Sequence, residues 1–283
     1  MKVLLLGGSG LVGSALRRAA PAAAQVEAPS HAALDVTDAA ALAQAVAAAK
    51  PAWILNAVGY TATDAAEREP VRARALNTEL PQALARLARE HGARVVHFSS
   101  DYVFGGARST AWREDDQPAP LSVYGASKAD GDAALLGADI GALVLRPSWI
   151  FGDGPRCFPR RMWERARAGQ ASRVVADQRG APTHADDLAS WTWALMGRGA
   201  TGLFHATNAG ETSWAEVAQR VYARAGMPDG VTPVSSAEWA AAAQRPSYSV
   251  LDCSKLEQAL GLTRRRWDVA LDAYLDTLMA SAR

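Results

Sequence analysis

Tyr124 and Lys128 stand four residues apart in the segment LSVYGASK (121–128). On an α-helix, residues at this spacing lie on the same face, about one turn from each other. A Lys ammonium beside a phenol can lower the phenol pKa from its usual value of about 10. A phenol tuned in this way can donate a proton to a carbonyl that is being reduced. By itself a Tyr-x-x-x-Lys pair is more often ordinary surface or packing, so its meaning depends on the elements around it.

A hydroxyl group that could join this pair follows the expected strand 95–98, where the chain reads Ser99 and then Ser100. Ligands of a parallel sheet bind at the carboxyl ends of its strands. We expect Ser100 to donate a hydrogen bond to a substrate carbonyl and to orient Tyr124, with Ser99 as the alternative. Lys128 would hold the nicotinamide ribose of a cofactor. Together these groups would stabilise alkoxide charge as a hydride arrives.

The glycine-spaced loop GGSGLVG (7–13) lies between an apolar strand and a helical segment. Its glycines at positions 7, 10 and 13 have the spacing G-x-x-G-x-x-G. Glycines permit close backbone approach and positive φ angles, and the N-terminus of the following helix attracts a pyrophosphate. An ordinary glycine-rich turn is the alternative, which the flanking strand and helix argue against. The residues expected to contact a dinucleotide here are Gly7, Ser9, Gly10, Leu11 and Val12.

The end of the second expected strand, 25–28, bears on the choice of dinucleotide. A carboxylate there would bind the ribose 2′-hydroxyl and repel a 2′-phosphate. The chain continues with Pro29, Ser30 and His31, and Glu27 comes too early for this role. NADPH is therefore mildly favoured as the cofactor. NADH is the alternative, because no arginine occurs at this point to bind a 2′-phosphate.

Two further segments are placed to meet the cofactor. Asp35 and Val36 follow the second strand and would meet the adenine, although a turn or cap role for Asp35 is equally open. Ala57, Val58 and Gly59 follow the third strand. Small residues at this point would let the cofactor pass close to the backbone.

Short apolar segments alternate with helical segments through the first half of the chain. Strands are expected at 3–6, 25–28, 53–57, 95–98 and 141–146. Helices are expected at 11–20, 38–50, 71–91 and 122–136. The third of these helices should be interrupted just before Pro81 and should stop at Gly92. This alternation predicts an α/β fold with a doubly wound Rossmann-type parallel sheet.

The pattern is less regular in the second half. We expect residues 1–147 to form an NAD(P)-binding Rossmann domain and residues 148–283 to form mainly a smaller C-terminal substrate-binding lobe. Within that second part, 201–206 has the pattern of a strand that returns to the main sheet. Residues 214–225 have the pattern of a helix.

The chain has 283 residues, of which 49% are hydrophobic and 21% charged, and its formal net charge is +1. This composition is typical of a globular protein and gives no electrostatic reason to bind nucleic acid or an anionic membrane. Cys157 and Cys253 lie far apart and outside any metal-ligand spacing. We therefore expect no metal, a reducing cytoplasmic location, and either a monomer or a homodimer.

Several longer motifs run through the chain. They are NAVGYTATDAAE (56–67), DYVFGG (101–106), YGASK (124–128), RPSWIFG (146–152), DQRGAPT (177–183) and RPSYSVLD (245–252). With these motifs the chain resembles the extended short-chain dehydrogenase/reductases, and within them the dTDP-4-dehydrorhamnose reductase family. The resemblance runs nearly end to end, and the last two motifs are the most particular to this family.

The resemblance implies reduction of the C4 ketone of dTDP-4-dehydrorhamnose to dTDP-L-rhamnose, with NADPH or NADH. It implies that Asp101 and Tyr102 line the sugar side of the site. It also implies that Trp149 lies against the sugar or the nucleotide, and that Arg245 lies near the substrate. For Trp149 a role as a core aromatic is an equally weighted alternative.

Three positions depart from the family pattern. Ala65 stands where many relatives have Lys, and Cys157 stands where Asn is common, so substrate contacts could differ. Ala15 stands where some relatives have a Glu that helps to hold a cation between subunits. We therefore expect no such cation site here.

Other functions stay open at this point. One is a reductase or epimerase for another nucleotide-activated 4-keto sugar. Another is a non-catalytic regulatory subunit that binds NADP without turnover, although such a protein need not keep Tyr124 and Lys128. A 4,6-dehydratase is disfavoured, because Ser100 is followed by Asp101 and Tyr102 and not by an Asp-Glu pair.

Overall fold

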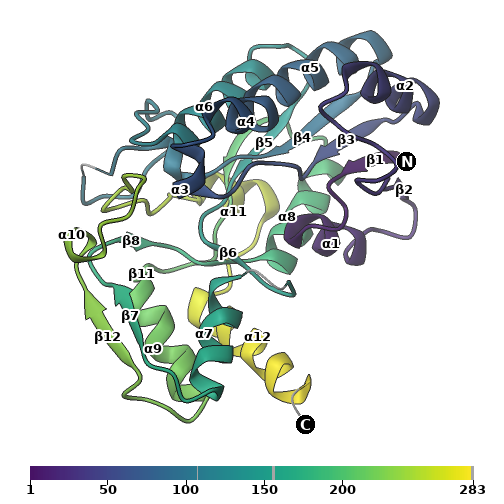
Figure 1. Ribbon diagram of the computed structural model, residues 1–283. Coiled ribbons are helices and arrows are strands. Elements are labelled where there is room, and N and C mark those ends of the chain that lie inside the picture. The colour runs from purple at the N-terminus through teal and green to yellow at the C-terminus, as the bar shows by residue number, and fades with distance from the viewer. Residues whose placement is uncertain (107, 155–156, 282–283) are drawn as a thin grey trace.

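A six-stranded parallel sheet forms the centre of the computed structural model, which describes residues 1–106, 108–154 and 157–281. The strand order is β10-β5-β4-β3-β1-β2, and every neighbouring pair is parallel (Figure 1). This confirms the doubly wound arrangement expected from the alternation of strands and helices. The strands are β1 (Lys2–Leu6), β2 (Gln25–Glu27), β3 (Trp53–Asn56), β4 (Arg94–Phe98), β5 (Leu143–Arg146) and β10 (Gly202–His205).

Continuous apolar runs explain why these strands occupy the centre. Residues 3–6 of β1 and all of β3 and β5 are buried, as expected of strands covered on both faces. One face of the sheet packs against α1 and α8, and the other against α2, α5 and α6. The bounds of these helices are α1 (Leu11–Arg18), α2 (Ala39–Ala49), α5 (Leu80–His91), α6 (Val123–Leu136) and α8 (Ala185–Gly197).

The ends of these helices follow the sequence signals. The Asp38 carboxylate caps α2 by accepting from two amides of its first turn, at 2.9 and 3.0 Å. Gly92 ends α5 in the left-handed region, with φ of +65°. Ser122 caps α6 with its hydroxyl group. The cap that fixes the start of this helix therefore lies two residues before Tyr124.

The segment ahead of α5 changes its helical type and does not break. After the short helix α3 (Thr63–Ala66), α4 (Pro70–Arg74) runs into a π-helical turn, Ala75–Glu79, which leads directly into α5. The interruption expected before Pro81 is therefore a change in hydrogen bonding within one helical segment. The π turn contains Asn77, which is fully buried.

The second half of the chain divides between the main sheet and a separate layer, the lower lobe in Figure 1. In that lobe α7, α9 and α12 enclose an apolar core of their own. Three two-stranded pairs, β7 with β12, β8 with β11 and β6 with β9, complete it. The bounds are β6 (Ile150–Phe151), α7 (Phe158–Arg167), β7 (Ser172–Val175), β8 (Arg179–Gly180), β9 (Thr183–His184), β11 (Thr212–Ser213), α9 (Trp214–Arg224), β12 (Val231–Val234), α10 (Ser236–Trp239) and α12 (Trp267–Ser281).

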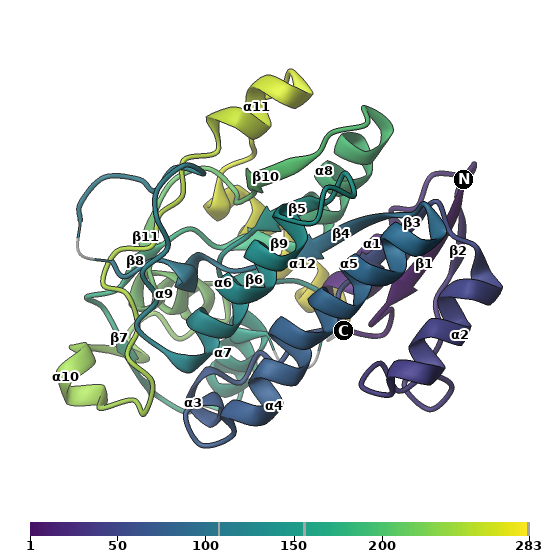
Figure 2. The same ribbon diagram turned by 90° about the horizontal axis from the view of Figure 1, so that it is seen from above.

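The main sheet takes up β10 and α11 (Ser254–Leu260) from this second half. Figure 2 shows α11 at the β10 end of the sheet and α2 at the β2 end. The carboxyl end of β5 leads towards the lower lobe, because Trp149, three residues after that strand, stacks on Trp214 of α9. Within the described part of the chain, none of the helices is long and apolar enough to cross a membrane.

Candidate active site

Ser100, Tyr124 and Lys128 come together at the carboxyl end of β4. Ser100 is the second residue after β4, and the other two lie one turn apart on α6. The Ser100 hydroxyl lies near enough to the Tyr124 phenol to lower its pKa, and Lys128 Nζ donates to the Phe98 carbonyl at 2.5 Å. All three residues are buried. The structure therefore assembles the predicted constellation, and the catalytic roles of its members stay predictions.

The hydroxyl of Ser100 also organises the turn that follows it. It accepts from the Tyr102 amide at 3.2 Å and donates to Asp101 Oδ1 at 3.1 Å. The other carboxylate oxygen of Asp101 accepts from Ser249 Oγ at 2.5 Å. Burial raises the pKa of Asp101 to about 7, against the effect of these hydrogen bonds. Asp101, expected on the sugar side, is thus buried and bound to two serine hydroxyls.

The pKa of the Tyr124 phenol is raised, whereas the sequence led us to expect a lowered value. Burial raises this pKa to about 12, and the nearby Ser100 hydroxyl opposes the rise. The carboxylates of Asp101 and Asp132 add to it. Lys128 does not contribute, so the expected lowering of the phenol pKa by the ammonium is wrong for this arrangement. A phenol with so high a pKa is protonated at neutral pH, which suits a proton donor in a reduction.

Lys128 lies between the end of β4 and the turn after β3. Burial lowers its pKa to about 8, while the carboxylate of Asp132 opposes this shift. A Cβ placed on Gly59 would lie 3.6 Å from Lys128 Nζ. Because Gly59 has no side chain, the ammonium faces the turn where Ala57 and Val58 are predicted to border the cofactor.

The glycine loop forms a tight turn between β1 and α1. Gly7 has a φ of +79°, which favours glycine, and its carbonyl accepts from the Gly10 amide at 3.0 Å. A Cβ on Gly13 would lie 2.1 Å from the Gly7 carbonyl oxygen, so only glycine lets the helix pack here. A Cβ on Gly10 would be 3.4 Å from its nearest described neighbour. Gly10 is therefore not required by packing within the protein.

This turn fits a dinucleotide pyrophosphate. The amides at the N-terminus of α1 have no partners within the helix and attract anions. A Cβ on Gly7 would meet the Ala57 backbone at 2.9 Å, so the glycine loop and the turn after β3 abut. Two groups of predicted cofactor residues are therefore adjacent. The exposed or half-buried residues of the loop itself are Gly7, Ser9, Gly10, Leu11 and Val12.

Asp35 makes the contacts of a turn residue. Its Oδ1 accepts from the amide and the hydroxyl of Thr37, at 2.9 and 2.7 Å. These hydrogen bonds lower the pKa of Asp35. Val36 is half-buried and packs against the core formed with α2. The turn alternative for Asp35 is thus present in the structure, and an adenine contact for either residue stays a prediction.

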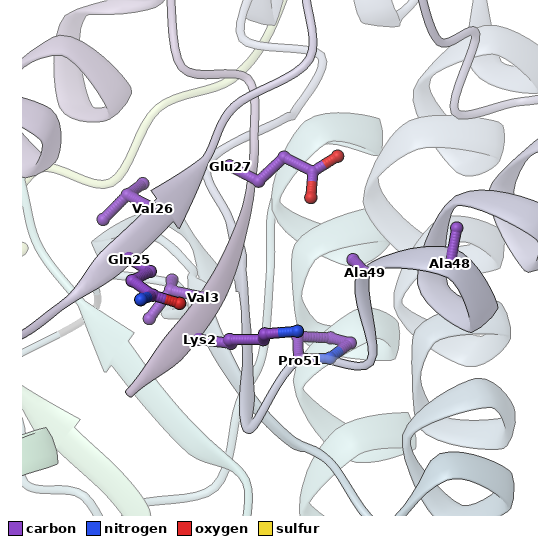
Figure 3. A pocket seen from close by; sticks show the side chains of 8 residues that line it. All are labelled: Lys2, Val3, Gln25, Val26, Glu27, Ala48, Ala49 and Pro51. Carbon is purple, nitrogen blue, oxygen red and sulfur yellow. The ribbon is translucent and has the colours of Figure 1, made fainter.

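Glu27 is the last residue of β2, and its side chain is exposed. Its side chain extends towards Ala48 and Ala49 of α2 (Figure 3). The next residue, Ala28, has its Cβ 2.9 Å from the position that a Cβ on Gly8 would take. Ala28, the residue that follows β2, therefore lies beside the glycine loop, which supports the inference that Glu27 comes too early to bind a ribose.

The pocket in Figure 3 is remote from this loop. It has a volume of about 290 Å³ and includes Lys2 and Pro51, which lie at the beginning of β1 and just before β3. A dinucleotide binds at the opposite, carboxyl ends of such strands. This pocket is thus not the candidate cofactor site.

A segment that we call the late strap, residues 243–252, connects the lower lobe with the sheet. Arg245 forms a two-pronged ion pair with Asp64 of α3, at 2.8 and 3.0 Å. The Ala243 amide donates to the same carboxylate at 3.0 Å. Burial raises the pKa of Tyr102 while Arg245 opposes the rise, so the guanidinium acts on that phenol. Arg245, expected near the substrate, is therefore engaged with Asp64 and Tyr102.

Trp149 belongs to an aromatic group below the end of β5. Its ring stacks on Trp214, with centroids 3.8 Å apart, and Phe158 packs edge-on against Trp214 at 4.8 Å. A Cβ on Gly180 would lie 2.6 Å from the Trp149 ring. Trp149 Nε1 is buried and has no hydrogen-bond partner among the described residues. The packing role is thus present, and contact with a ligand stays a prediction.

Two of the three positions that depart from the family pattern, Cys157 and Ala65, have ordinary surroundings. The Cys157 thiol is buried and donates to the Gly152 carbonyl at 3.3 Å, with the Tyr274 hydroxyl 3.4 Å away. Ala65 is half-buried and packs near Tyr124. Among the residues that the structure describes, no three His, Cys, Asp or Glu side chains gather in a way that could hold a metal ion.

Sequence reasoning missed Asn77, which joins three parts of the site. Its side chain accepts from the Tyr60 amide at 2.9 Å and donates to Ser127 Oγ at 3.0 Å. Asn77 thereby holds the turn after β3 against α6, next to Lys128. The π turn that aims this side chain has no signal in the local sequence.

Sequence reasoning also missed the buried pair of Asp132 and Arg146. Asp132 Oδ2 accepts from Arg146 Nε at 2.9 Å. Asp132 lies four residues after Lys128 on α6, and that spacing was a signal that could have revealed it. Arg146 is the last residue of β5, which is a ligand-facing position in a parallel sheet.

The chain matches the model of the family described as the RmlD substrate binding domain, over residues 1–280. The chain belongs to the dTDP-4-dehydrorhamnose reductase family. It is 42% identical to the probable dTDP-4,6-dihydroxy-2-methyloxan-3-one 4-ketoreductase of Streptomyces antibioticus, over 99% of this chain and 97% of that protein. It is 38% identical to the dTDP-4-dehydrorhamnose reductase of Streptomyces griseus, over 99% of this chain and 94% of that protein.

Solved structures of the family agree with this fold. The dTDP-4-dehydrorhamnose reductase of Bacillus anthracis, in complex with NADP, matches with a TM-score of 0.94 and 30% sequence identity. The match covers 98% of this chain and 99% of that one. The expected family and the Rossmann-type fold are therefore confirmed.

Proposed function

We propose that the protein is an NAD(P)H-dependent reductase that converts the C4 ketone of dTDP-4-dehydrorhamnose (dTDP-4-dehydro-6-deoxy-L-mannose) to the alcohol of dTDP-L-rhamnose. NADPH is the expected hydride donor, and NADH is the alternative. The family supports this proposal, since named reductases of this sugar match along nearly the whole chain. NADP in the Bacillus anthracis relative supports the cofactor.

The observation that carries the proposal is the meeting of Ser100, Tyr124 and Lys128 at the end of β4, next to the turn after β3, which in turn abuts the glycine loop. When bound, the dinucleotide supplies the hydride. Tyr124 is protonated at neutral pH and gives its proton to the C4 oxygen, while Ser100 holds that oxygen and the phenol in place. Lys128 provides a positive charge beside the turn that follows β3. A regulatory subunit would not need this buried proton donor.

On the substrate side we assign the sugar to the space between the end of β4 and the lower lobe. Asp101, Tyr102, Trp149 and Arg245 border that space in our proposal. Tyr102 and Arg245 act together, because the guanidinium lies beside the phenol. Residues 148–283 would supply most of the substrate-binding lobe. A cytoplasmic enzyme that is a monomer or a homodimer is the form we expect.

A second candidate substrate is another nucleotide-activated 4-keto-6-deoxy sugar. The relative from Streptomyces antibioticus, at 42% identity, favours it because that protein is named for a ketone that differs from dTDP-4-dehydrorhamnose. The chemistry at C4 would be the same for both. The difference would lie in the side chains that contact the rest of the sugar ring.

The test is NADPH oxidation, followed by absorbance, with dTDP-4-dehydrorhamnose generated in situ and the product identified by mass and chromatography. Formation of dTDP-L-rhamnose would establish the proposed activity. Oxidation only with a different 4-keto sugar would favour the second substrate. NADPH binding without oxidation of any such sugar would contradict both and favour a regulatory role. A 4-epimerase would invert C4 of a 4-hydroxy sugar nucleotide, with no net oxidation of NADPH.

A further inference from the structure

A buried ion pair lies directly behind the candidate catalytic residues. Asp132 of α6 and Arg146 of β5 have side chains only 2% and 3% exposed. Asp132 Oδ2 accepts from Arg146 Nε at 2.9 Å and from Ser99 Oγ at 2.7 Å. The Arg146 guanidinium also lies over the Phe104 ring, 5.2 Å from its centroid. None of these contacts has a part in the proposed reaction as described so far.

Stability alone is a weak explanation for this pair. Removing two charges from water costs several kcal/mol for each ion, and apolar residues of the same size are often as stable. Moreover, the pair is incompletely satisfied, because Asp132 Oδ1 and Arg146 Nη1 are buried and have no partner among the described residues. Unsatisfied buried groups are uncommon in native structures and call for a specific reason.

The position of Asp132 supplies such a reason. Tyr124, Lys128 and Asp132 follow each other at intervals of four residues, so they form one stripe along α6. The Asp132 carboxylate binds Ser99, which directly precedes Ser100 at the end of β4. Through Arg146 it also binds the end of β5. One carboxylate therefore ties the helix that carries the proton donor to both strand ends that border it.

The charges around Lys128 point to the same residue. From α6 itself, the Asp132 carboxylate raises the pKa of Lys128 against burial, which is the larger effect and lowers it. From β4, His97 faces Lys128, but burial holds the His97 pKa well below its usual value, so that ring is neutral. The π turn contributes Asn77, which has no charge, and the turn after β3 contributes Gly59. Among the described residues that act on Lys128, Asp132 is thus the one that carries a negative charge.

We propose that Asp132 is a positioning residue of the reductase: it fixes the Tyr124–Lys128 face of α6 on the ends of β4 and β5, and it places a carboxylate one helical turn from Lys128. This proposal rests on the proposed function only in assuming that the site is that of a reductase. Arg146 and Ser99 are the partners that hold the carboxylate in place. If the pair were merely structural, its loss would change stability and leave the protonation of Lys128 unaffected.

The test is the affinity for NADPH, measured by fluorescence from about pH 6 to about pH 10, a range that brackets the ordinary titration of buried Lys and His groups. In the natural protein the affinity should fall as Lys128 loses its proton, at about pH 8. Asp132→Asn keeps the size and removes the charge, so the midpoint of this fall should move down by about one pH unit. Asp132→Glu keeps the charge and should restore the original midpoint.

An unchanged midpoint in folded Asp132→Asn would overturn the proposal, whatever happens to stability. If this variant does not fold because Arg146 is left unpaired, the double variant Asp132→Asn/Arg146→Gln removes both charges, and such replacements are often tolerated. The double variant also lacks the Asp132 carboxylate, which raises the pKa of Lys128 against burial. It should therefore show a downward shift too, and an unchanged midpoint there would overturn the proposal equally.

The titration separates this inference from the proposed activity, because NADPH binding requires no turnover. If the natural protein shows the expected pH dependence and oxidises NADPH with no 4-keto sugar, the proposed function fails and the role of Asp132 stands. If turnover is observed and the midpoint is the same in Asp132→Asn and the natural protein, the function stands and the role of Asp132 fails.

Discussion

The catalytic stripe of α6 and the late strap (residues 243–252) reach the site by opposite routes. On α6, Tyr124, Lys128 and Asp132 recur every four residues, so helix geometry alone puts them on one face. A single capping residue, Ser122, fixes where this helix begins. The stripe is therefore specified within a short stretch of sequence.

The late strap depends on partners that are distant in the sequence. Arg245 binds Asp64 across 181 residues, and Ser249 binds Asp101 across 148. Its neighbours in the chain reveal neither contact. The position of the strap therefore depends on its contacts with α3 and with the turn after β4.

This difference separates two kinds of function. In our proposal, the chemistry resides on a helix that the sequence specifies locally, whereas enclosure of the substrate depends on a segment that is held by long-range contacts. Substitutions on the stripe should therefore act on the rate of reaction. Substitutions that release the strap should act mainly on the affinity for the sugar nucleotide.

The largest effect should come from Tyr124→Phe on the stripe. Without the phenol no proton reaches the C4 oxygen, so kcat should fall by about 10²–10⁴-fold, the usual contribution of a general acid. NADPH affinity should stay near that of the natural protein. Tyr102→Phe is a matched control, because this variant also loses only a hydroxyl group. The Tyr102 ring packs edge-on against the Tyr124 ring, with centroids 6.0 Å apart. Equal rate losses in both variants would contradict the assignment of Tyr124 as the donor.

Most of the fold could be predicted from the sequence, because its signals are local. Continuous apolar runs marked the buried strands of the sheet. Asp38 and Gly92 marked helix ends, and both act as caps in the structure. The π turn at 75–79 could not be predicted, since a change from one helical hydrogen bond to another leaves no mark in apolar spacing.

The candidate site divides in the same way. The spacing of Tyr124 and Lys128 predicted their shared face, but their pKa values depend on burial by elements far away in the chain. That burial, with no help from Lys128, sets the phenol pKa at about 12. Likewise, nothing in the motif RPSYSVLD (245–252) predicts that Arg245 would find Asp64. Tertiary contacts decide both points.

A second test uses two glycines of one local motif. Gly10→Val adds bulk where the pyrophosphate would approach, and a steric cost of about 1–3 kcal/mol would weaken NADPH binding roughly 10–100-fold. The melting temperature should change little, because the nearest described atom lies 3.4 Å from the Cβ position. Gly13→Ala should instead lower the melting temperature or prevent folding, since its Cβ would lie 2.1 Å from the Gly7 oxygen. Unchanged NADPH affinity in Gly10→Val would mean that the loop does not bind the cofactor.

A third test releases the strap. Arg245→Gln removes the ion pair with Asp64 and should raise KM for the sugar nucleotide roughly tenfold, the equivalent of one charge-assisted hydrogen bond. Its effect on kcat should be smaller than that of Tyr124→Phe. Asp64→Asn leaves Arg245 in place without its counter-charge. This variant therefore distinguishes loss of the ion pair from loss of the guanidinium. If both variants changed kcat and left KM unchanged, the strap would act on the reaction step. That result would contradict the distinction between the strap and the stripe of α6.

The smallest effect should come from Glu27→Gln at the end of β2, and here the sequence and the structure make the same prediction. Glu27 extends towards α2 (Figure 3), and Ala28 is the residue that lies against Gly8. The charge of Glu27 should therefore leave the ratio of NADPH to NADH affinities unchanged. Ala28→Asp would place a carboxylate beside Gly8, where it should repel a 2′-phosphate and lower NADPH affinity several-fold relative to NADH. Titration of both variants with both dinucleotides measures the ratio. If Glu27→Gln changed this affinity ratio and Ala28→Asp did not, Glu27 would be the residue nearest the ribose. The inference that Glu27 comes too early in the sequence would then be wrong by one residue.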